Sequence, residues 1–140
     1  MEDTITVRGA VKIELNGSII VEKDNLIVTT GKNFLTVPIL SASASPMTHM
    51  AIGSGTTAAA LTDTTLETEI TRQAFTTASV TANVATINCL YAAGTGTGTI
   101  TEAGLLNAAV AGTLLSRVVF TAIPKGALDT LSITWTVTVG

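Results

Sequence analysis

The stretch Thr130-Leu-Ser-Ile-Thr-Trp-Thr-Val-Thr-Val139 alternates apolar and polar side chains without a break. In a β-strand, successive side chains point to opposite faces of the sheet. This segment therefore predicts a strand with Leu131, Ile133, Trp135 and Val137 facing a core and a row of Thr and Ser facing solvent. β-branched Thr suits the strand backbone, and its hydroxyl keeps the outer face polar.

The same alternation recurs along most of the chain. Ile5, Val7, Val11, Ile13 and Leu15 predict a strand over residues 4–15, and Asn16-Gly17 after it is a strong hairpin turn signal. Further strands are expected over 18–21, 26–28, 48–52, 70–81, 84–91, 99–103, 113–121 and 130–139. Residues 70–81 and 84–91 are expected to form a hairpin that turns near Ala82-Asn83.

Only one stretch favours a helix. It spans residues 31–37, where Phe34 and Leu35 offer an apolar side and Pro38 prevents continuation. Parallel sheets need helical crossovers, for which this chain has no room. We therefore expect an all-β fold: an antiparallel β-sandwich or jelly roll of about eight strands in a single domain over 1–140. Residues 1–15 are expected to form an N-terminal arm or an edge strand.

Composition excludes several classes of protein. The chain has 140 residues, of which 46% are hydrophobic and only 12% charged, with 27 Thr, and its mean hydropathy is +0.54. It is too apolar for a disordered chain, and its net charge of −3 argues against binding to nucleic acid. A single cysteine excludes a disulfide framework, and we expect neither a signal peptide nor a membrane span.

Charge is unevenly distributed. Nine of the 17 charged residues lie in the first 33 positions, and the other 107 positions hold eight. The small number of charges in residues 34–140, which we call the body, favours a surface that is covered by other protein chains, because the surface of a free domain is about a quarter or more charged. The alternative is that Thr, Ser and Asn alone supply the polarity.

No set of residues predicts catalysis or a cofactor. His49 is the only histidine, and Ser54 in Gly53-Ser54-Gly55 is not placed in a nucleophile elbow, so a triad with Asp63 is not favoured. Cys89 lies in a predicted strand and reads as a buried thiol. The glycine-rich segments at 53–55 and 94–98 lack the lysine of a phosphate-binding loop and are expected to be turns with positive φ. We therefore expect no metal, no cofactor and no enzymatic activity.

Five segments, in this order, resemble the small β-sandwich structural proteins of tailed bacteriophages. They are Met50-Ala-Ile-Gly-Ser-Gly-Thr-Thr57, Leu66-Glu-Thr-Glu-Ile-Thr-Arg72, Ile100-Thr-Glu-Ala-Gly-Leu-Leu106, Gly112-Thr-Leu-Leu-Ser-Arg-Val-Val-Phe120 and Asp129-Thr-Leu-Ser-Ile-Thr-Trp-Thr-Val-Thr-Val139. The resemblance covers residues 48–139 and is greatest to capsid decoration, or cement, proteins. It extends to the N-terminal module of tail-collar fibre proteins, although Leu106-Asn107 departs from the aromatic and acidic pair of that module.

The resemblance implies a non-enzymatic protein made in the bacterial cytoplasm and placed on the outer surface of the phage head. It would be a homotrimer that binds the major capsid protein and stabilises junctions between its subunits. The alternative is a tail or fibre module that contacts host carbohydrate. Candidate contacts to the capsid or to other subunits are the charged residues of the N-terminal segment, namely Glu2, Asp3, Arg8 and Lys12.

Four further charged residues are candidates for structural salt bridges rather than for a ligand site. Glu69 and Arg72 lie three positions apart, which places them on opposite faces of a strand unless a bulge intervenes. Glu102 and Arg117 lie on two different predicted strands and could pair with them.

Overall fold

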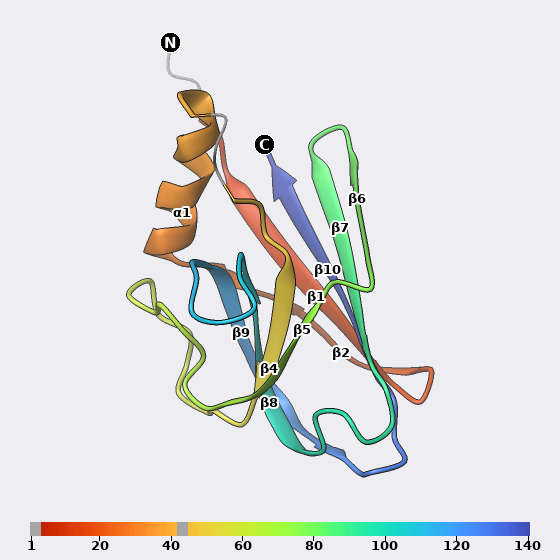
Figure 1. The fold of residues 1–140 in the computed structure, drawn as a ribbon. Coiled ribbons are helices and arrows are strands. Elements are labelled where there is room, and N and C mark those ends of the chain that lie inside the picture. Colours follow the sequence, from red (N-terminus) through yellow and green to blue (C-terminus); the bar gives the residue numbers. More distant parts are fainter. Residues whose placement is uncertain (1–3, 42–44) are drawn as a thin grey trace.

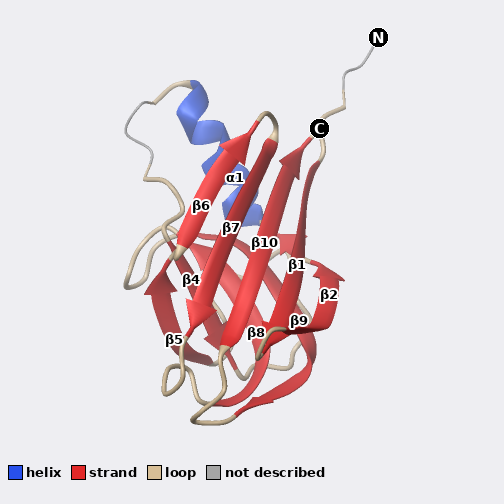
Figure 2. Ribbon diagram, turned by 90° about the vertical axis from the view of Figure 1, so that its right-hand side faces the viewer, coloured by secondary structure: helices blue, strands red, loops and turns tan. Residues whose placement is uncertain are grey.

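A computed structural model describes residues 4–41 and 45–140. It contains two five-stranded sheets in which the paired strands run antiparallel. The all-β sandwich predicted from the alternating pattern is confirmed. Figures 1 and 2 show the two sheets packed face to face.

Sheet A has the strand order β2-β1-β10-β7-β6. Its strands are β1 (Val7–Leu15), β2 (Ser18–Asp24), β6 (Thr77–Thr81), β7 (Val84–Tyr91) and β10 (Leu131–Val139). The first and last strands of the chain lie side by side, with Val7 opposite Val139 and Leu15 opposite Leu131. β1 is therefore an interior strand, so residues 7–15 form neither the arm nor the edge strand that we expected over 1–15, and residues 1–3 of that range lie outside the described residues.

Sheet B has the order β3-β9-β8-β4-β5. Its strands are β3 (Leu26–Ile27), β4 (His49–Gly53), β5 (Glu69–Ala74), β8 (Gly98–Leu106) and β9 (Leu114–Lys125). The expected hairpin of 70–81 with 84–91 is wrong in its first half, because the chain changes sheets between two adjacent residues. Phe75 N–H donates to Thr48 O in sheet B, whereas Thr76 N–H donates to Asn88 O in sheet A.

The count of about eight strands is therefore too low. Residues 70–81, expected as one strand, form two strands in different sheets. No Gly, Pro or Asn marks the change of sheet at Phe75-Thr76. The period-2 pattern continues through that point because both halves are extended.

The main core lies between the sheets. Its members alternate along each strand as the pattern predicts, and Ile13, Ile133 and Trp135 are completely buried. A second, smaller cluster lies on the outer face of sheet B, beneath the segment 54–68 that joins β4 to β5. It consists of Val28, Ala51, Leu66, Leu106 and Leu114. The outer face of sheet B is thus covered by the chain itself.

The single α-helix, α1 (Thr29–Thr36), lies against β9 and continues into a 3-10 turn, η1 (Val37–Ile39). The helix predicted at 31–37 is present, and Pro38 lies in the 3-10 turn that ends it. Gly31 is in contact with β9: a Cβ atom there would come within 2.1 Å of Leu115 O. Within the described part of the chain, no helix is both long and apolar enough to cross a membrane.

Candidate functional site

The structure describes two of the four N-terminal contact candidates. Glu2 and Asp3 lie outside the described residues. Arg8 and Lys12 lie on β1, on the face of sheet A that is turned away from the core, opposite Thr138 and Thr134 of β10. The Nζ atom of Lys12 lies 3.6 Å from Glu14 Oε1, and both side chains are partly exposed. An ion pair of this kind adds little to stability, so these charges remain available for contacts with a partner.

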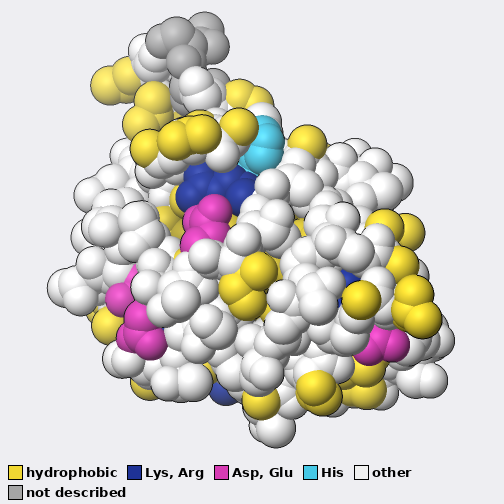
Figure 3. Space-filling view, turned by 60° about the horizontal axis from the view of Figure 1, so that its bottom comes forward, with side chains coloured by type: hydrophobic (Ala, Val, Ile, Leu, Met, Phe, Trp, Pro, Cys, Tyr) yellow, Lys and Arg dark blue, Asp and Glu magenta, His cyan; other side chains and the backbone are white. Residues whose placement is uncertain are grey.

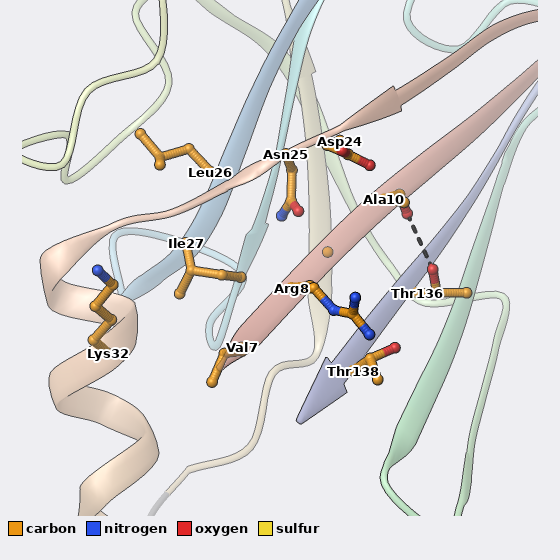
Figure 4. Close-up of a pocket in the computed structure, with 11 residues that line it drawn as sticks. Val7, Arg8, Ala10, Asp24, Asn25, Leu26, Ile27, Lys32, Thr136 and Thr138 are labelled. Atoms are coloured by element: carbon orange, nitrogen blue, oxygen red, sulfur yellow. Dashed lines mark hydrogen bonds between the residues drawn. The ribbon is translucent and has the colours of Figure 1, made fainter. Parts of the chain in front are cut away.

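A cavity of about 460 Å³ opens beside Arg8, where β2 leaves β1. Figure 4 shows Arg8, Thr136 and Thr138 on one side of β1, and Ile27 and Lys32 on the other. The two cationic side chains point away from each other, so they do not form one anion site. The Asn25 side chain is buried without a hydrogen-bond partner, and it lies where a Cβ atom on residue 9 would come within 2.1 Å of its Oδ1 atom. A side chain at position 9 would therefore displace the Asn25 side chain.

The most extensive polar network in the molecule surrounds the buried carboxylate of Glu102 on β8. Glu102 accepts hydrogen bonds from Arg117 Nε at 3.0 Å and from the backbone N–H groups of Gly55, Glu67 and Thr68 at 2.6–2.9 Å. Arg117 on β9 is 2% exposed and also donates to Asp63 Oδ2 and Thr57 O, each at 3.0 Å. These bonds fix both ends of the 54–68 segment on the outer face of sheet B.

The pKa of Arg117 reflects this environment. Burial alone would lower the pKa, but the hydrogen bonds and charges of Glu102 and Asp63 outweigh burial and raise the pKa above its ordinary value. Within the segment, a hydrogen bond from the Thr57 side chain and the Thr56 N–H lower the pKa of Glu67 below 4.5. The Glu102 carboxylate and the Arg117 guanidinium thus hydrogen-bond to protein groups, and these bonds hold the 54–68 segment on sheet B.

Glu69 and Arg72 form a separate pair. Ile52 of β4 is opposite Thr71, but Gly53 is opposite Glu69, so Ile70 is an extra residue in a β-bulge. The bulge turns Glu69 and Arg72 to the same side, where two bonds of 2.8 and 3.1 Å join them. Arg72 also donates to the carbonyls of Ala108 and Ala111 and so holds the loop between β8 and β9.

The four salt-bridge candidates thus form two pairs that hold two different loops. All four candidates form salt bridges, but without the possible pairing between the two sets: Arg72 pairs with Glu69, and Arg117 pairs with Glu102 and Asp63. Asp63 and Glu67 were not predicted to take part. A sequence signal for the site did exist, because Glu102 and Arg117 each interrupt an otherwise apolar strand.

The glycines of the 53–55 segment have a role other than the one predicted. Gly53 and Gly55 are absent from the residues with positive φ, whereas Gly94, Gly96 and Gly98 adopt it as expected. A Cβ atom on Gly55 would lie 2.3 Å from Glu102 Oε2. Glycine is needed at position 55 because the carboxylate lies against the backbone.

The geometry does not assemble the residues considered for catalysis. His49 begins β4 and Ser54 follows its end, so the strand rise separates them by about 17 Å. The His49 Nδ1 atom is 2.7 Å from Thr48 Oγ1. Burial raises the pKa of the Cys89 thiol above 9.0, which keeps it protonated. In residues 4–41 and 45–140 no group of three or more His, Cys, Asp or Glu side chains could hold a metal ion.

The surface of the body carries fewer cationic side chains than its sequence contains, because several of them are buried. Residues 34–140 contain three cationic side chains, Arg72, Arg117 and Lys125, and all three are largely buried. Lys125 is 2% exposed and donates to Ala92 O at 3.1 Å. The exposed cationic groups are thus confined to the first 33 residues, and in Figure 3 charged side chains are few among neutral ones.

Six of the 13 exposed large apolar side chains in the described part of the chain lie at one end of the sandwich, which we call the apolar end. Figures 1 and 2 show that α1, the β6–β7 turn, the start of β1 and the C-terminal end of β10 lie there. Its exposed residues are Ile5, Val37, Ile39, Leu40, Val80 and Val139, with Leu40 96% and Val80 75% exposed. An apolar groove of about 500 Å³ lies between α1 and the β6–β7 hairpin and includes Phe34, Met47 and Val137. Exposed clusters of this kind are typical of interaction surfaces.

Comparisons with family models, curated proteins and solved structures found no match to this chain.

Proposed function

We propose that this chain is a non-enzymatic structural protein of a tailed bacteriophage: a decoration protein that binds the outside of the capsid as a homotrimer. It would stabilise the junctions between major capsid subunits. The family assignment rests on the sequence resemblance. The observation that supports a binding role is the apolar end, where six large apolar side chains are exposed on a sandwich whose cationic side chains in residues 34–140 are largely buried.

The distribution of charge fits a protein that packs among other chains. Burial of charged side chains in an interface is costly unless each finds a partner. The body avoids this cost because its cationic groups are already paired internally, as for Arg117 with Glu102 and Asp63. Exposed Arg8 and Lys12 would give the contact its orientation and specificity, whereas apolar burial would supply most of the affinity.

The carbohydrate-binding alternative has less support. Sugars stack on exposed aromatic rings, but none of the five aromatic side chains is exposed. Tyr91, Phe120 and Trp135 are buried, and Phe34 and Phe75 pack against the main core. Binding to a glycan array would favour this alternative over the decoration role.

The decoration role is tested by co-sedimentation with expanded, undecorated heads of the phage that encodes the chain. We expect saturable binding by the wild-type protein. Arg8→Gln with Lys12→Gln should weaken binding about tenfold or more, through the loss of two oriented charge contacts. Lys23→Gln with Lys32→Gln removes the same charge elsewhere and should bind within about twofold of wild type. A stable monomer that does not sediment with heads would refute the proposal.

A further inference from the structure

The two sheets have four edge strands, and three of them are protected against pairing with another chain. β2 carries Glu22, Lys23 and Asp24, and its register with β1 is broken by a bulge. β5 carries Glu69 and Arg72 and is bulged at Ile70. β3 is only two residues long. Charges, bulges and short length are the devices by which proteins prevent strand addition at an edge.

The fourth edge, β6, has none of these devices. Its sequence Thr77-Ala-Ser-Val-Thr81 contains no charge, no proline and no glycine, and all five residues are exposed. Its register with β7 is continuous from Thr77 to Thr81. No charged residue occurs anywhere between Arg72 and Glu102. The β6 edge of sheet A is therefore exposed and uncharged, while the other three edges are protected.

The pairing of β7 with β10 and β6 determines which backbone N–H and C=O groups of β6 point out from the free edge. Val139 N–H donates to Asn83 O, so the odd-numbered residues of β7 turn their backbone groups toward β10 and the even-numbered ones toward β6. Even-numbered Thr86 is opposite Ser79. The backbone groups of Ser79 thus turn inward to β7, and those of Ala78 and Val80 point out from the free edge.

We propose that this edge pairs with the β6 edge of a second copy of the chain, antiparallel, about a twofold axis at Ser79. Ala78 of each copy would then lie opposite Val80 of the other, and each of these two pairs would exchange two backbone hydrogen bonds. Ser79 would face its own counterpart in the non-hydrogen-bonded pair between them. The two five-stranded sheets would join into one sheet of ten strands.

Charge favours a second copy as the occupant. A twofold contact places every residue near the same residue of the partner, so any charge near the axis would meet a like charge. A similar contact through β2 or β5 would bring the charges of Glu22, Lys23 or Glu69 close to their own copies. The stretch around β6 is the part of the sequence that avoids this repulsion, because its nearest charges are Arg72 and Glu102.

Apolar surface beside the edge would extend the contact. Five paired residues cover only a fraction of the about 800 Å² per partner that a stable interface buries. Val80 and Ala78 are opposite Ala85 and Ile87, on the side of sheet A that faces the core. There they line an open cavity of about 390 Å³ that also includes Met47 and Phe75. The twofold would place the cavities of the two copies next to each other, covering Val80, which is 75% exposed in one chain.

This contact does not depend on the proposed function. On its own it gives a dimer, and combined with the threefold contact of the proposed trimer it gives a hexamer. Native mass spectrometry of the wild-type protein is therefore expected to show an even number of chains. A monomer, or a trimer alone, would overturn the inference, although a trimer that bound heads would leave the decoration role intact.

Disulfide trapping tests the register. The Cα atoms of a non-hydrogen-bonded antiparallel pair lie about 4.5 Å apart, within the range that a disulfide spans. Under mild oxidation, Ser79→Cys is expected to form nearly complete disulfide-linked dimers. The native Cys89 does not interfere, because its side chain is buried. The matched control is Ser18→Cys, which replaces an exposed serine on the protected β2 edge. This variant should remain largely monomeric on a non-reducing gel.

A charged edge residue tests the contact without any cross-link. Val80→Lys places an ammonium group on the shared side of the joined sheets and should halve the native mass. Val110→Lys is the same substitution at a residue that is 83% exposed in the loop between β8 and β9, and should keep the wild-type mass. If Val80→Lys folds with an unchanged circular dichroism spectrum and retains the wild-type mass, or if Ser79→Cys links no better than Ser18→Cys, the edge is not the contact.

Discussion

At the scale of single residues, buried charge decides how the long connection from β4 to β5 is held. The carboxylate of Glu102 is completely buried and accepts three backbone N–H groups in addition to Arg117. Such a site is expensive to disturb, because removal of one member of a buried ion pair leaves the other without compensation. By comparison, a partly exposed pair such as Lys12 with Glu14 contributes little to stability.

Glu102→Gln is therefore expected to lower the free energy of unfolding by about 3 kcal/mol, because Arg117 loses its buried anionic partner and keeps only the partly exposed Asp63, and the amide NH₂ group would face backbone N–H donors. Glu14→Gln, the same change at a partly exposed ion pair, should cost less than about 1 kcal/mol. Denaturation in urea, with both variants compared at constant m-value, measures the difference. Equal effects of the two substitutions would show that the Glu102 network contributes nothing to stability.

At the scale of elements, contact with the sheet overrides helix propensity in α1. Gly31 is buried where α1 meets β9, and Thr30 Oγ1 donates to Leu114 O at 2.9 Å. Glycine normally weakens a helix by about 1 kcal/mol relative to alanine. Here the missing Cβ atom allows the helix to approach the backbone of Leu115.

Gly31→Ala is expected to destabilise the protein by about 1–3 kcal/mol, the range for overpacking, although alanine favours the helix. Asn33→Ala, at an exposed position of the same helix, should instead be neutral or add a few tenths of a kcal/mol. Thermal unfolding followed by circular dichroism measures whether each substitution raises or lowers the stability. Stabilisation by Gly31→Ala would contradict the close contact of α1 with β9.

At the scale of the whole molecule, the placement of charge determines how the protein responds to acid. The side chain of Asn16 and the N–H of Gly126 hydrogen-bond the Asp129 carboxylate and lower its pKa below 3.8. The pKa of Glu67 is lowered below 4.5 by Thr57 and Thr56. Because both values are lower in the folded than in the unfolded state, both carboxylates stabilise the fold above their ordinary pKa values.

The melting temperature is therefore expected to stay nearly level from neutral pH down to about pH 5, and to fall as the pH drops through and below 4.5 and then 3.8. The loss arises because the unfolded chain takes up these protons first. In the double variant Glu67→Gln with Asp129→Asn, the acid slope should be shallower than in the wild type. Calorimetry across this pH range checks the slope, and identical slopes would contradict the assignment.

Much of this architecture is already determined by the sequence. Period-2 alternation in Thr130–Val139 and in residues 4–15 is a local property, because each side chain's face follows from its neighbours along one strand. The Asn16-Gly17 turn is equally local: both residues have positive φ, at 51° and 85°. The paucity of charge in residues 34–140 was likewise visible without a structure.

Tertiary structure alone decided the features that depend on which strands become neighbours. The change of sheet between Phe75 and Thr76 carries no local signal, because an extended chain looks alike in either sheet. The bulge at Ile70 pairs Glu69 with Arg72, and the 54–68 segment brings Asp63 to Arg117. The open β6 edge is also invisible in its own five residues, because an edge is defined by the strand that is missing beside it. Side-chain alternation is fixed by backbone geometry over a few residues, whereas partners far apart in the sequence are fixed only when the whole chain packs.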